Sequence, residues 1–550
     1  MASCKNCIKD FTIYPDDLKM YQKFEVPQPT LCPDCRQQRR LAWRGNLAFY
    51  QRACGLCRQP IITQYSADLP FPVYCPECWW GDGWDRLANG IVYDPARPFF
   101  EQLSQVINSS PRLSSYTLKC DNCDYVDKTA GSKNCYLIIG SQDSEDCYYG
   151  EKFLKSKDCV DCNFVVECEL CYGCIDSRGA YNCNFCQACP RSTNCSGCYD
   201  CRGCSDCFGC WNLRNKQFYI FNKQYSEVEY QAKMKEYNLG SYQNLQKVRA
   251  QFAASRASQA IHRFALITHS TNVFGDYIFR SDNCWRCFNV MEFKDCRYAS
   301  DDEKGTEMMD TNNCGYGELC YEVQDAYGNH WCRFGNLITE DSFCDYSSHL
   351  TSCHDCFGCG SLHKASFCIL NKQYGETEYK KLRVQIIQQM QTTGEWGEFS
   401  PVHLSPYPYN ESKASIFYPL SQEEVLAKGW RYKDEDAPSG AAHQLPAYTI
   451  PDDIQEVSDD ILAAVLPCEQ CGKQYKIIKQ ELDFYRKKNI AAPRHCFRCR
   501  YLALFNVRNF RQLYHRSCMN TGCKNEFETT YAPDRPEKVY CEECYQKEIY

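Results

Sequence analysis

The sequence lacks the features that identify membrane proteins and most enzymes. No apolar run approaches the ~18 residues that a membrane-spanning helix needs, and the first residues do not resemble a signal peptide. The 10 histidines are scattered, and none stands beside a cysteine as a nucleophile–base pair would require. There is no phosphate-binding loop, no dinucleotide fingerprint and no HExxH motif. These absences argue against a membrane protein, and they leave no catalytic residue or small-molecule substrate to propose.

Cysteine, by contrast, is abundant, with 45 residues in a chain of 550. Without a secretion signal we expect a cytoplasmic protein, in which thiols stay reduced and paired cysteines indicate metal before disulfide. A chain of this length should hold several domains. The net charge of -7 argues against a surface that binds nucleic acid over its whole extent.

A cysteine recurs at every twelfth residue in two long stretches. The first runs from Cys123 to Cys207 and the second from Cys284 to Cys368, where Met308 fills one gap. Within each period, positions 1, 4, 7 and 10 are mostly small or apolar, which fits neither a helical period near 3.6 nor a strand period of 2. A strict period indicates stacked repeats. We therefore predict a mainly β protein with two cysteine-rich β-solenoids of twelve residues per coil.

The period also sets the predicted boundaries. The solenoids should span 111–222 and 260–371, each followed by an Asn-Lys-Gln-Tyr sequence and a helical cap, at 223–259 and 372–395. An open solenoid end exposes strand edges, so such caps are expected. Residues 396–466 form a predicted connector without cysteines, with short helices near 422–428 and 452–466.

Two details concern the individual coils. Asn or Asp often precedes the period cysteine, and these residues tolerate the left-handed backbone of a tight corner. In the second stretch Asp302, Asn329 and Asp341 fall on nominally interior positions, so the pattern predicts its middle less clearly.

Cysteine knuckles lie in pairs at both ends of the chain, in predicted modules 1–50, 51–100, 467–515 and 516–550. Four thiolates in two knuckles match tetrahedral Zn²⁺, and a site with no open position is structural. We therefore expect about four structural zinc ions. The predicted ligands are Cys4, Cys7, Cys32, Cys35, Cys54, Cys57, Cys75, Cys78, Cys468, Cys471, Cys496, Cys499, Cys518, Cys523, Cys541 and Cys544.

The two ends of the chain are copies of each other. The first C-terminal module repeats the cysteine gaps of the first N-terminal module, and other positions match as well, among them Tyr21 with Tyr485 and Arg36 with Arg500. Both ends are also basic. The arginines that we consider for nucleic-acid binding are Arg36, Arg39, Arg40, Arg44, Arg494, Arg498, Arg500, Arg508 and Arg511. The alternative is that these arginines neutralise the zinc thiolates and solvate a helix face.

The repeat cysteines offer a second possibility for metal. In five consecutive periods, from Cys159 to Cys210, positions 1 and 4 are both cysteine. Two neighbouring coils would then bring together the four sulfur atoms that a zinc or iron–sulfur site needs. Buried free cysteine also fills small gaps well, and uniform coils do not spread sulfur atoms tetrahedrally. Reduced thiols are therefore the default, with additional metal or a disulfide ladder as alternatives.

Three resemblances accompany these patterns. The stretch from Cys4 to Arg36 resembles small bacterial zinc-ribbon or treble-clef domains, which implies a knuckle, a hairpin and a helix whose first turn supplies Cys32 and Cys35. The coil period is similar to that of insect β-helical antifreeze proteins, although their outward Thr-x-Thr ladder is missing. The whole layout resembles a family of large cysteine-rich bacterial proteins that has no activity to transfer.

The sequence thus favours a non-enzymatic zinc-binding scaffold or adaptor. Its basic modules would dock to RNA, a ribonucleoprotein or a protein complex. The rival hypothesis is a thiol-rich metal-storage or redox protein that uses the repeat cysteines. The metal content distinguishes the two hypotheses, because a scaffold needs about four zinc ions and a store needs many more.

Overall fold

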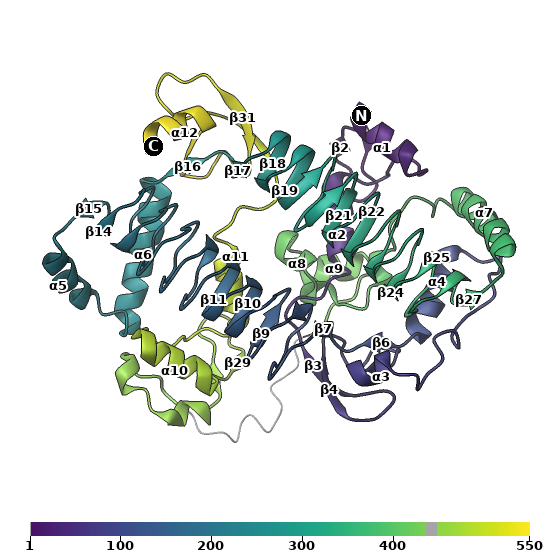
Figure 1. The fold of residues 1–550 in the computed structure, drawn as a ribbon, viewed down its shortest axis with the longest axis horizontal. Helices are drawn as coiled ribbons and strands as arrows, with labels where there is room; N and C mark the ends of the chain where they lie inside the picture. The colour runs from purple at the N-terminus through teal and green to yellow at the C-terminus, as the bar shows by residue number, and fades with distance from the viewer. Residues whose placement is uncertain (1, 435–447) are drawn as a thin grey trace. The chain divides into compact units, whose positions relative to one another are not determined.

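The structure, a computed structural model, describes residues 2–434 and 448–550 (Figure 1). The chain divides into two compact units. Unit 1 consists of Met1–Ser115 and Ala265–Lys433, and unit 2 of Tyr116–Phe264 and Asp434–Tyr550. Unit 1 therefore combines the N-terminal cysteine knuckles with the second repeat, and unit 2 combines the first repeat with the C-terminal knuckles. No described helix is both long and apolar enough to cross a membrane.

The first repeat is a ladder of short strands, which we call ladder 1. Neighbouring strands pair with an offset of one period, so that Cys147 lies opposite Cys159 and Gly150 opposite Cys162. Isolated bridges continue the same register as far as Arg202 and Arg214. The strands are β7 (Thr117–Leu118), β8 (Thr129–Ala130), β9 (Tyr136–Ile139), β10 (Glu145–Leu154), β11 (Lys157–Val166), β12 (Ile175–Arg178), β13 (Ser205–Phe208), β14 (Gln217–Ile220) and β15 (Lys223–Gln224).

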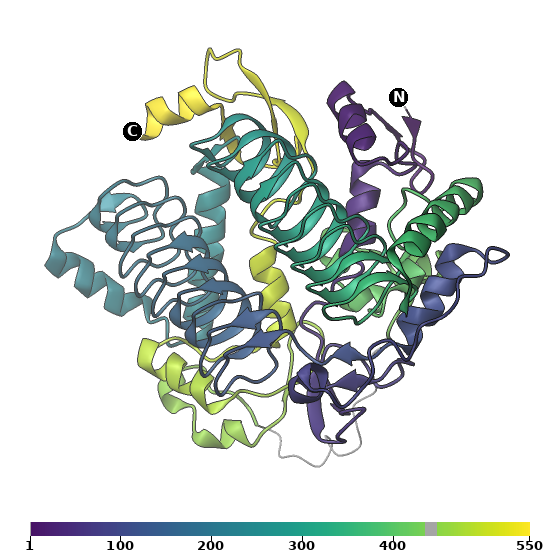
Figure 2. The same cartoon turned by 45° about the vertical axis from the view of Figure 1, so that its right-hand side comes forward.

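The second repeat, ladder 2, forms the corresponding stack in unit 1, and Figure 2 shows its successive turns of chain. Each sheet in the chain is small, with two to four strands. The strands of ladder 2 are β17 (Ile267–Thr268), β18 (Thr271–Phe279), β19 (Asp282–Lys294), β20 (Glu303–Thr306), β21 (Met309–Gly315), β22 (Tyr321–Tyr327), β23 (Asn336–Thr339), β24 (Ser348–Thr351), β25 (His354–Phe357), β26 (Ser366–Ile369) and β27 (Lys372–Gln373). The strands of each ladder are parallel except for the last, because β15 pairs antiparallel with β14, as β27 does with β26.

The start of ladder 2 departs from the predicted period. Thr271 pairs with Asp282 and Val273 with Cys284, one residue short of a period, and the register shifts between Phe274 and Gly275. Gly275 has a φ of 144°, and a Cβ there would lie 1.9 Å from the carbonyl oxygen of Cys287. Only glycine permits this close approach. The regular phase therefore does not extend back to residue 260.

Left-handed backbone recurs along both ladders, at intervals of about three residues. In one turn of ladder 1, Asp158, Asp161, Phe164 and Glu167 all have φ between 50° and 55°. This conformation is costly for residues other than glycine, and Asn and Asp tolerate it best. Stacked Asn side chains offset part of the cost, as where Asn182 Nδ2 donates to Asn194 Oδ1 at 2.8 Å. The structure thus places left-handed residues at more positions than the one predicted.

The interior of each ladder is packed with buried cysteine, together with smaller numbers of Val, Ile, Phe, Leu and Ala. The polar residues at interior positions of ladder 2 do not interrupt it, because they bond to the backbone. Asp341, which is 1% exposed, accepts the N–H groups of Cys353 at 2.6 Å and Thr339 at 2.9 Å. Asn329 donates to the Ile338 carbonyl at 2.9 Å, and Asp302 accepts the N–H of Cys314. The repeat therefore continues through its middle.

Asp341 makes the stability of ladder 2 depend on pH. Burial raises its pKa to about 8, although the two N–H donors oppose the shift. In the unfolded chain the pKa of the same carboxyl is ~4. Between about pH 4 and about pH 8 the folded state therefore binds one more proton than the unfolded state. The free energy of unfolding falls by up to ~1.4 kcal/mol per pH unit as the pH rises through this window. The midpoint temperature of thermal unfolding, measured from about pH 5 to about pH 8, should decline less steeply with pH in Asp341→Asn than in the unchanged protein. Equal slopes would show that the carboxyl does not titrate in this window.

Helices cover the ends of the ladders. Ladder 1 is followed by α5 (Glu227–Tyr237), whose capping box joins Ser226 and Glu229, and by α6 (Tyr242–Ser258). Ladder 2 is followed by α7 (Glu376–Thr393). The connector contains α8 (Ala414–Phe417) and α9 (Gln422–Ala427), which agrees with the predicted helix near 422–428.

The helix predicted near 452–466 is wrong. The structure has two short 3-10 helices there, η4 (Ile454–Glu456) and η5 (Asp459–Leu462), in addition to η1 (Val402–Leu404) and η2 (Tyr409–Glu411) earlier in the connector. An N-cap at Asp453 begins η4, and Ser458 begins η5, so the segment is interrupted. Residues 435–447 of the predicted connector lie outside the described residues.

The knuckle modules are small hairpins and helices. Unit 1 contains β1 (Ala2–Ser3), β2 (Asp10–Phe11), α1 (Pro15–Lys23), α2 (Pro33–Leu41), β3 (Tyr50–Ala53), β4 (Pro60–Thr63), β5 (Val73–Tyr74), α3 (Pro76–Trp80), α4 (Phe99–Ser109) and β6 (Arg112–Leu113). Unit 2 contains β16 (Ile261–Arg263), β28 (Leu466–Pro467), β29 (Gln474–Tyr475), α10 (Lys479–Lys488), α11 (Phe497–Phe505), β30 (Tyr514–Ser517), β31 (Glu526–Thr529), β32 (Lys538–Tyr540) and α12 (Glu542–Ile549).

Candidate metal centres and their docking contacts

Within the described residues, four groups of four cysteines bring their sulfur atoms within 4.8 Å of one another. They are the four predicted sets: Cys4, Cys7, Cys32 and Cys35; Cys54, Cys57, Cys75 and Cys78; Cys468, Cys471, Cys496 and Cys499; and Cys518, Cys523, Cys541 and Cys544. One Sγ–Sγ distance in each group lies between 3.7 and 3.9 Å. A tetrahedral zinc ion with bonds of about 2.3 Å requires about 3.8 Å. The groups therefore fit such an ion.

The backbone around each group supports thiolates. The third cysteine of each group is the N-cap of a helix, namely α2, α3, α11 or α12. Its N–H donates to the sulfur of the first cysteine, at 3.2 Å from Cys32 to Cys4 and at 3.3 Å from Cys75 to Cys54. Burial raises the pKa of Cys54, but these N–H groups outweigh it and lower the pKa to about 6. Donors aimed at sulfur favour the charged ligand form.

The ladder cysteines differ in that their thiols lie within hydrogen-bond distance of backbone carbonyl oxygens, although some also accept a backbone N–H. Cys159 Sγ lies 3.2 Å from the Lys157 carbonyl oxygen and 3.5 Å from that of Cys168, so the thiol is the donor. At most ladder cysteines the sulfur atom makes the same two contacts, with the carbonyl oxygen two residues before it and the carbonyl oxygen nine residues after it. Examples are Cys171, Cys183 and Cys195. A thiol that donates to a carbonyl must keep its proton. All 45 cysteines are free of disulfide bonds.

The two kinds of cysteine should differ in reactivity. In metal-free protein at neutral pH, iodoacetamide should alkylate the cysteines of the four groups within minutes, because their thiolates are accessible. The buried ladder thiols should react only after unfolding, with the half-buried Cys120 and Cys123 as exceptions. Peptide mass spectrometry measures both. Rapid alkylation of Cys159 or Cys171 in the folded protein would contradict protonated, enclosed thiols.

In unit 1, helix α2 is joined to ladder 2 by a buried network of charges. Arg36 Nη2 lies 3.0 Å from Asp310 Oδ2, and Arg40 Nη1 lies 3.2 Å from Asp310 and 3.0 Å from Glu322. Arg39 Nη2 lies 2.8 Å from the same Glu322. Arg36, Arg40, Asp310 and Glu322 are at most 1% exposed. Burial raises the pKa of Glu322 while the arginines oppose the shift. The network fixes the first cysteine-knuckle module on ladder 2.

In unit 2, helix α11 is joined to ladder 1 in a related way (Figure 1). Arg500 lies 3.2 Å from Asp161 and 2.8 Å from Glu481 of α10, and Arg508 lies 3.3 Å from Asp176. Burial raises the pKa of Asp161 to about 7 although Arg500 lowers it. The Asp161 carboxyl is therefore only partly ionised near neutral pH, while Arg500 stays charged.

The two docking interfaces are copies of each other. Asp310 and Asp161 both lie two residues after a period residue, Met308 and Cys159. The aromatic contacts agree as well, because Tyr21 packs edge-on against Tyr321 and Tyr485 against Tyr172. The corresponding positions are Arg36 and Arg500, Arg44 and Arg508, Asp310 and Asp161, Asp325 and Asp176, Tyr298 and Tyr149, and Asp17 and Glu481. The duplication thus includes both the modules and the ladder surfaces that receive them.

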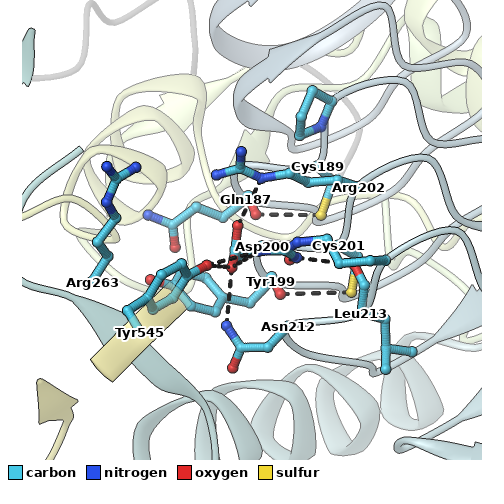
Figure 3. Close-up of polar contacts among 12 residues, drawn as sticks. Gln187, Cys189, Tyr199, Asp200, Cys201, Arg202, Asn212, Leu213, Arg263 and Tyr545 are labelled. Carbon is cyan, nitrogen blue, oxygen red and sulfur yellow. Dashed lines mark hydrogen bonds and ion pairs between the residues drawn. The ribbon is translucent and has the colours of Figure 1, made fainter. Parts of the chain in front are cut away.

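The last module docks through a separate buried carboxylate in unit 2. Figure 3 shows Asp200 of ladder 1 facing Tyr545 of α12, which donates to Asp200 Oδ2. Arg214 Nη2 lies 2.9 Å from the same oxygen, Asn212 Nδ2 lies 3.0 Å from it, and Arg202 lies 3.2 Å from Oδ1. In addition, β32 pairs in parallel with β16. The second module of unit 1 likewise uses β5, which pairs with β6.

The structure changes the interpretation of the basic residues. Arg36, Arg39, Arg40 and Arg44 are buried, and the side chains of Arg500 and Arg508 are 11% and 8% exposed. These six side chains point to carboxylates of their own unit, which corrects the expectation that they form a nucleic-acid surface. The acids that receive them were missed, although their matched spacing after the period residues was a usable signal. Arg498 is exposed, while Arg494 and Arg511 are half-buried.

Comparison with known proteins adds no assignment. No protein-family model matches the sequence, and no curated protein matches it significantly.

Proposed function

We propose that the protein is a non-enzymatic zinc-binding scaffold. In this proposal each ladder is a β-solenoid with twelve residues per coil, and four structural zinc ions hold the treble-clef modules that dock on the solenoids. The observation that carries the proposal is the pair of matched interfaces, where Arg36 meets Asp310 and Arg500 meets Asp161. Each arginine follows a metal-ligating cysteine directly in sequence. Metal binding and assembly of each unit are therefore coupled.

The proposed partner is RNA, a ribonucleoprotein or a protein complex. Support comes from the basic charge that remains at the surface of the C-terminal module, at Arg498 and, in part, at Arg494 and Arg511. Cross-linking to RNA in cells tests this part of the proposal. Recovery of protein without cross-linked RNA would favour a protein partner.

The metal content of the purified protein tests the scaffold. We expect four zinc ions per chain by inductively coupled plasma mass spectrometry, one for each group of four cysteines. A content well above four would instead support the metal-storage hypothesis, because the ladder thiols would then be ligands. A content near zero in folded protein would overturn both.

A further inference from the structure

Unit 2 contains a cleft beside the interface between ladder 1 and helix α11. It has a volume of about 200 Å³ and lies between helix α6, ladder 1, and helix α11 with the loop before it. Four arginines line it, namely Arg249, Arg256, Arg494 and Arg500, against one acid, Asp161. Because Arg500 pairs with Asp161 and Arg494 pairs with Glu469 at 3.5 Å, the charges of Arg249 and Arg256 remain to be balanced.

The duplication explains why the cleft is open. In unit 1, Glu322 of ladder 2 meets Arg39 and Arg40 of α2 and fills the space between them. The corresponding positions of unit 2 are Gly173, Ala503 and Leu504, and all three line the cleft. The side chains that close the interface in unit 1 are thus replaced by small or apolar ones. One polar atom in this wall is unsatisfied: Asp161 Oδ1 is buried and has no hydrogen-bond partner among the described residues.

Helix α6 supplies the opposite wall and its charge. Phe252 packs so closely on the ladder that a Cβ at Gly197 would lie 2.1 Å from its ring. Arg249 and Arg256 lie on the same face, two turns apart. Neither forms an ion pair with any residue in 2–434 or 448–550. Arg256 donates instead to Gln187 Oε1 at 3.0 Å.

Aromatic rings accompany these cations. The Arg249 guanidinium lies 5.1 Å from the ring centre of Phe185, and the Arg494 guanidinium lies 4.2 Å from that of Tyr242. Phe185 and Tyr242 are half-buried, so part of each ring remains accessible. Arginines beside accessible rings are what phosphate and a nucleobase require together.

The geometry points to a nucleotide-binding site in this cleft, with the phosphate at Arg249 and Arg256 and the base against Phe185 or Tyr242. The volume lies below the ~300 Å³ at which pockets for drug-sized ligands begin, so a single nucleotide unit is the largest occupant. That unit is either a free nucleotide or one residue of a single-stranded RNA. The inference deepens the partner part of the proposed function and does not depend on the zinc stoichiometry.

Binding to the full-length, zinc-loaded protein tests the site. The probes are AMP, UMP, adenosine, inorganic phosphate and an oligouridylate, titrated by calorimetry at low salt. We expect AMP or the oligouridylate to bind, and Arg249→Glu to weaken binding about tenfold or more through loss of a charge-assisted contact. Ala253→Leu, on the exposed face of α6 that lines the cleft, should weaken it by filling space. Lys247→Glu is the matched control, since Lys247 is exposed on α6 outside the cleft.

The outcomes are distinct. Tighter binding of the oligouridylate than of AMP would identify an RNA strand as the ligand, and binding of AMP alone would identify a free nucleotide; either supports the site. Binding of neither at about 1 mM, equal binding of inorganic phosphate and AMP, or full binding by Arg249→Glu would overturn it. Four zinc ions in each variant would show that the scaffold is intact, so the two proposals can fail separately.

Discussion

Replacing Cys35 by serine is expected to reduce the zinc content from four ions per chain to three and to release helix α2 from ladder 2. A serine hydroxyl is a poor zinc ligand, and a structural zinc ion contributes ~10–16 kcal/mol of apparent binding free energy to small zinc domains. Because Arg36 follows Cys35, loss of the metal should also free the buried arginines. Metal analysis and hydrogen exchange measure the two effects, with faster exchange expected across Pro33–Leu41.

The matched control is Cys171→Ser in ladder 1. Cys171 is buried and donates to the carbonyls of Glu169 and Ala180. Serine already fills this role at Ser144, whose hydroxyl contacts the carbonyls of Gln142 and Phe153 at 3.1 Å each. The control should therefore keep all four zinc ions and lose only ~1 kcal/mol of stability. Loss of zinc in this variant, or its full retention in Cys35→Ser, would contradict the division of cysteines into ligands and packing thiols.

The sequence pattern predicts the metal groups well because short-range spacing determines them. A knuckle places two sulfur atoms from neighbouring residues, so the group of Cys4, Cys7, Cys32 and Cys35 could be named without a structure. The twelve-residue register is also local, since most ladder strands pair with the next period of the chain. The register shift between Phe274 and Gly275 was not predicted, because the cysteine period begins only after it and does not indicate a bulge.

The sequence did not predict which knuckle modules pack against which repeat. Nothing in the spacing indicates that the N-terminal modules share a unit with the second repeat and the C-terminal modules with the first. The arginines illustrate the consequence. In the sequence, Arg36 and Arg40 belong to a basic segment that is typical of a binding surface. In the structure, they pair with Asp310 and Glu322, which are far away in sequence. A charge pattern alone therefore did not distinguish a partner site from an internal ion pair.

Removing the charge of Glu322 is expected to destabilise unit 1 by about 3–5 kcal/mol, because it leaves Arg39 and Arg40 buried with too few partners. Glu322 and Arg40 are 0% exposed, so water cannot replace the lost carboxylate. Chemical denaturation of Glu322→Gln measures the effect. The control is Asp16→Asn, which breaks the exposed pair with Lys19 and should cost less than ~1 kcal/mol.

The duplicated interface offers a sharper form of the same experiment. Unit 2 has Gly173, Ala503 and Leu504 where unit 1 has Glu322, Arg39 and Arg40, and the equivalent of Arg36 is Arg500, which pairs with Asp161 and Glu481. The triple variant Glu322→Gly, Arg39→Ala and Arg40→Leu removes one acid and two bases together, and it leaves Arg36 paired with Asp310. It should recover part of the stability lost in Glu322→Gln, since Asp310 keeps Arg36 and only Glu398, whose side chain is 17% exposed, loses its Arg39 partner. If the triple variant were less stable than Glu322→Gln, the ion network would be the main source of docking energy, and unit 2 would need another source.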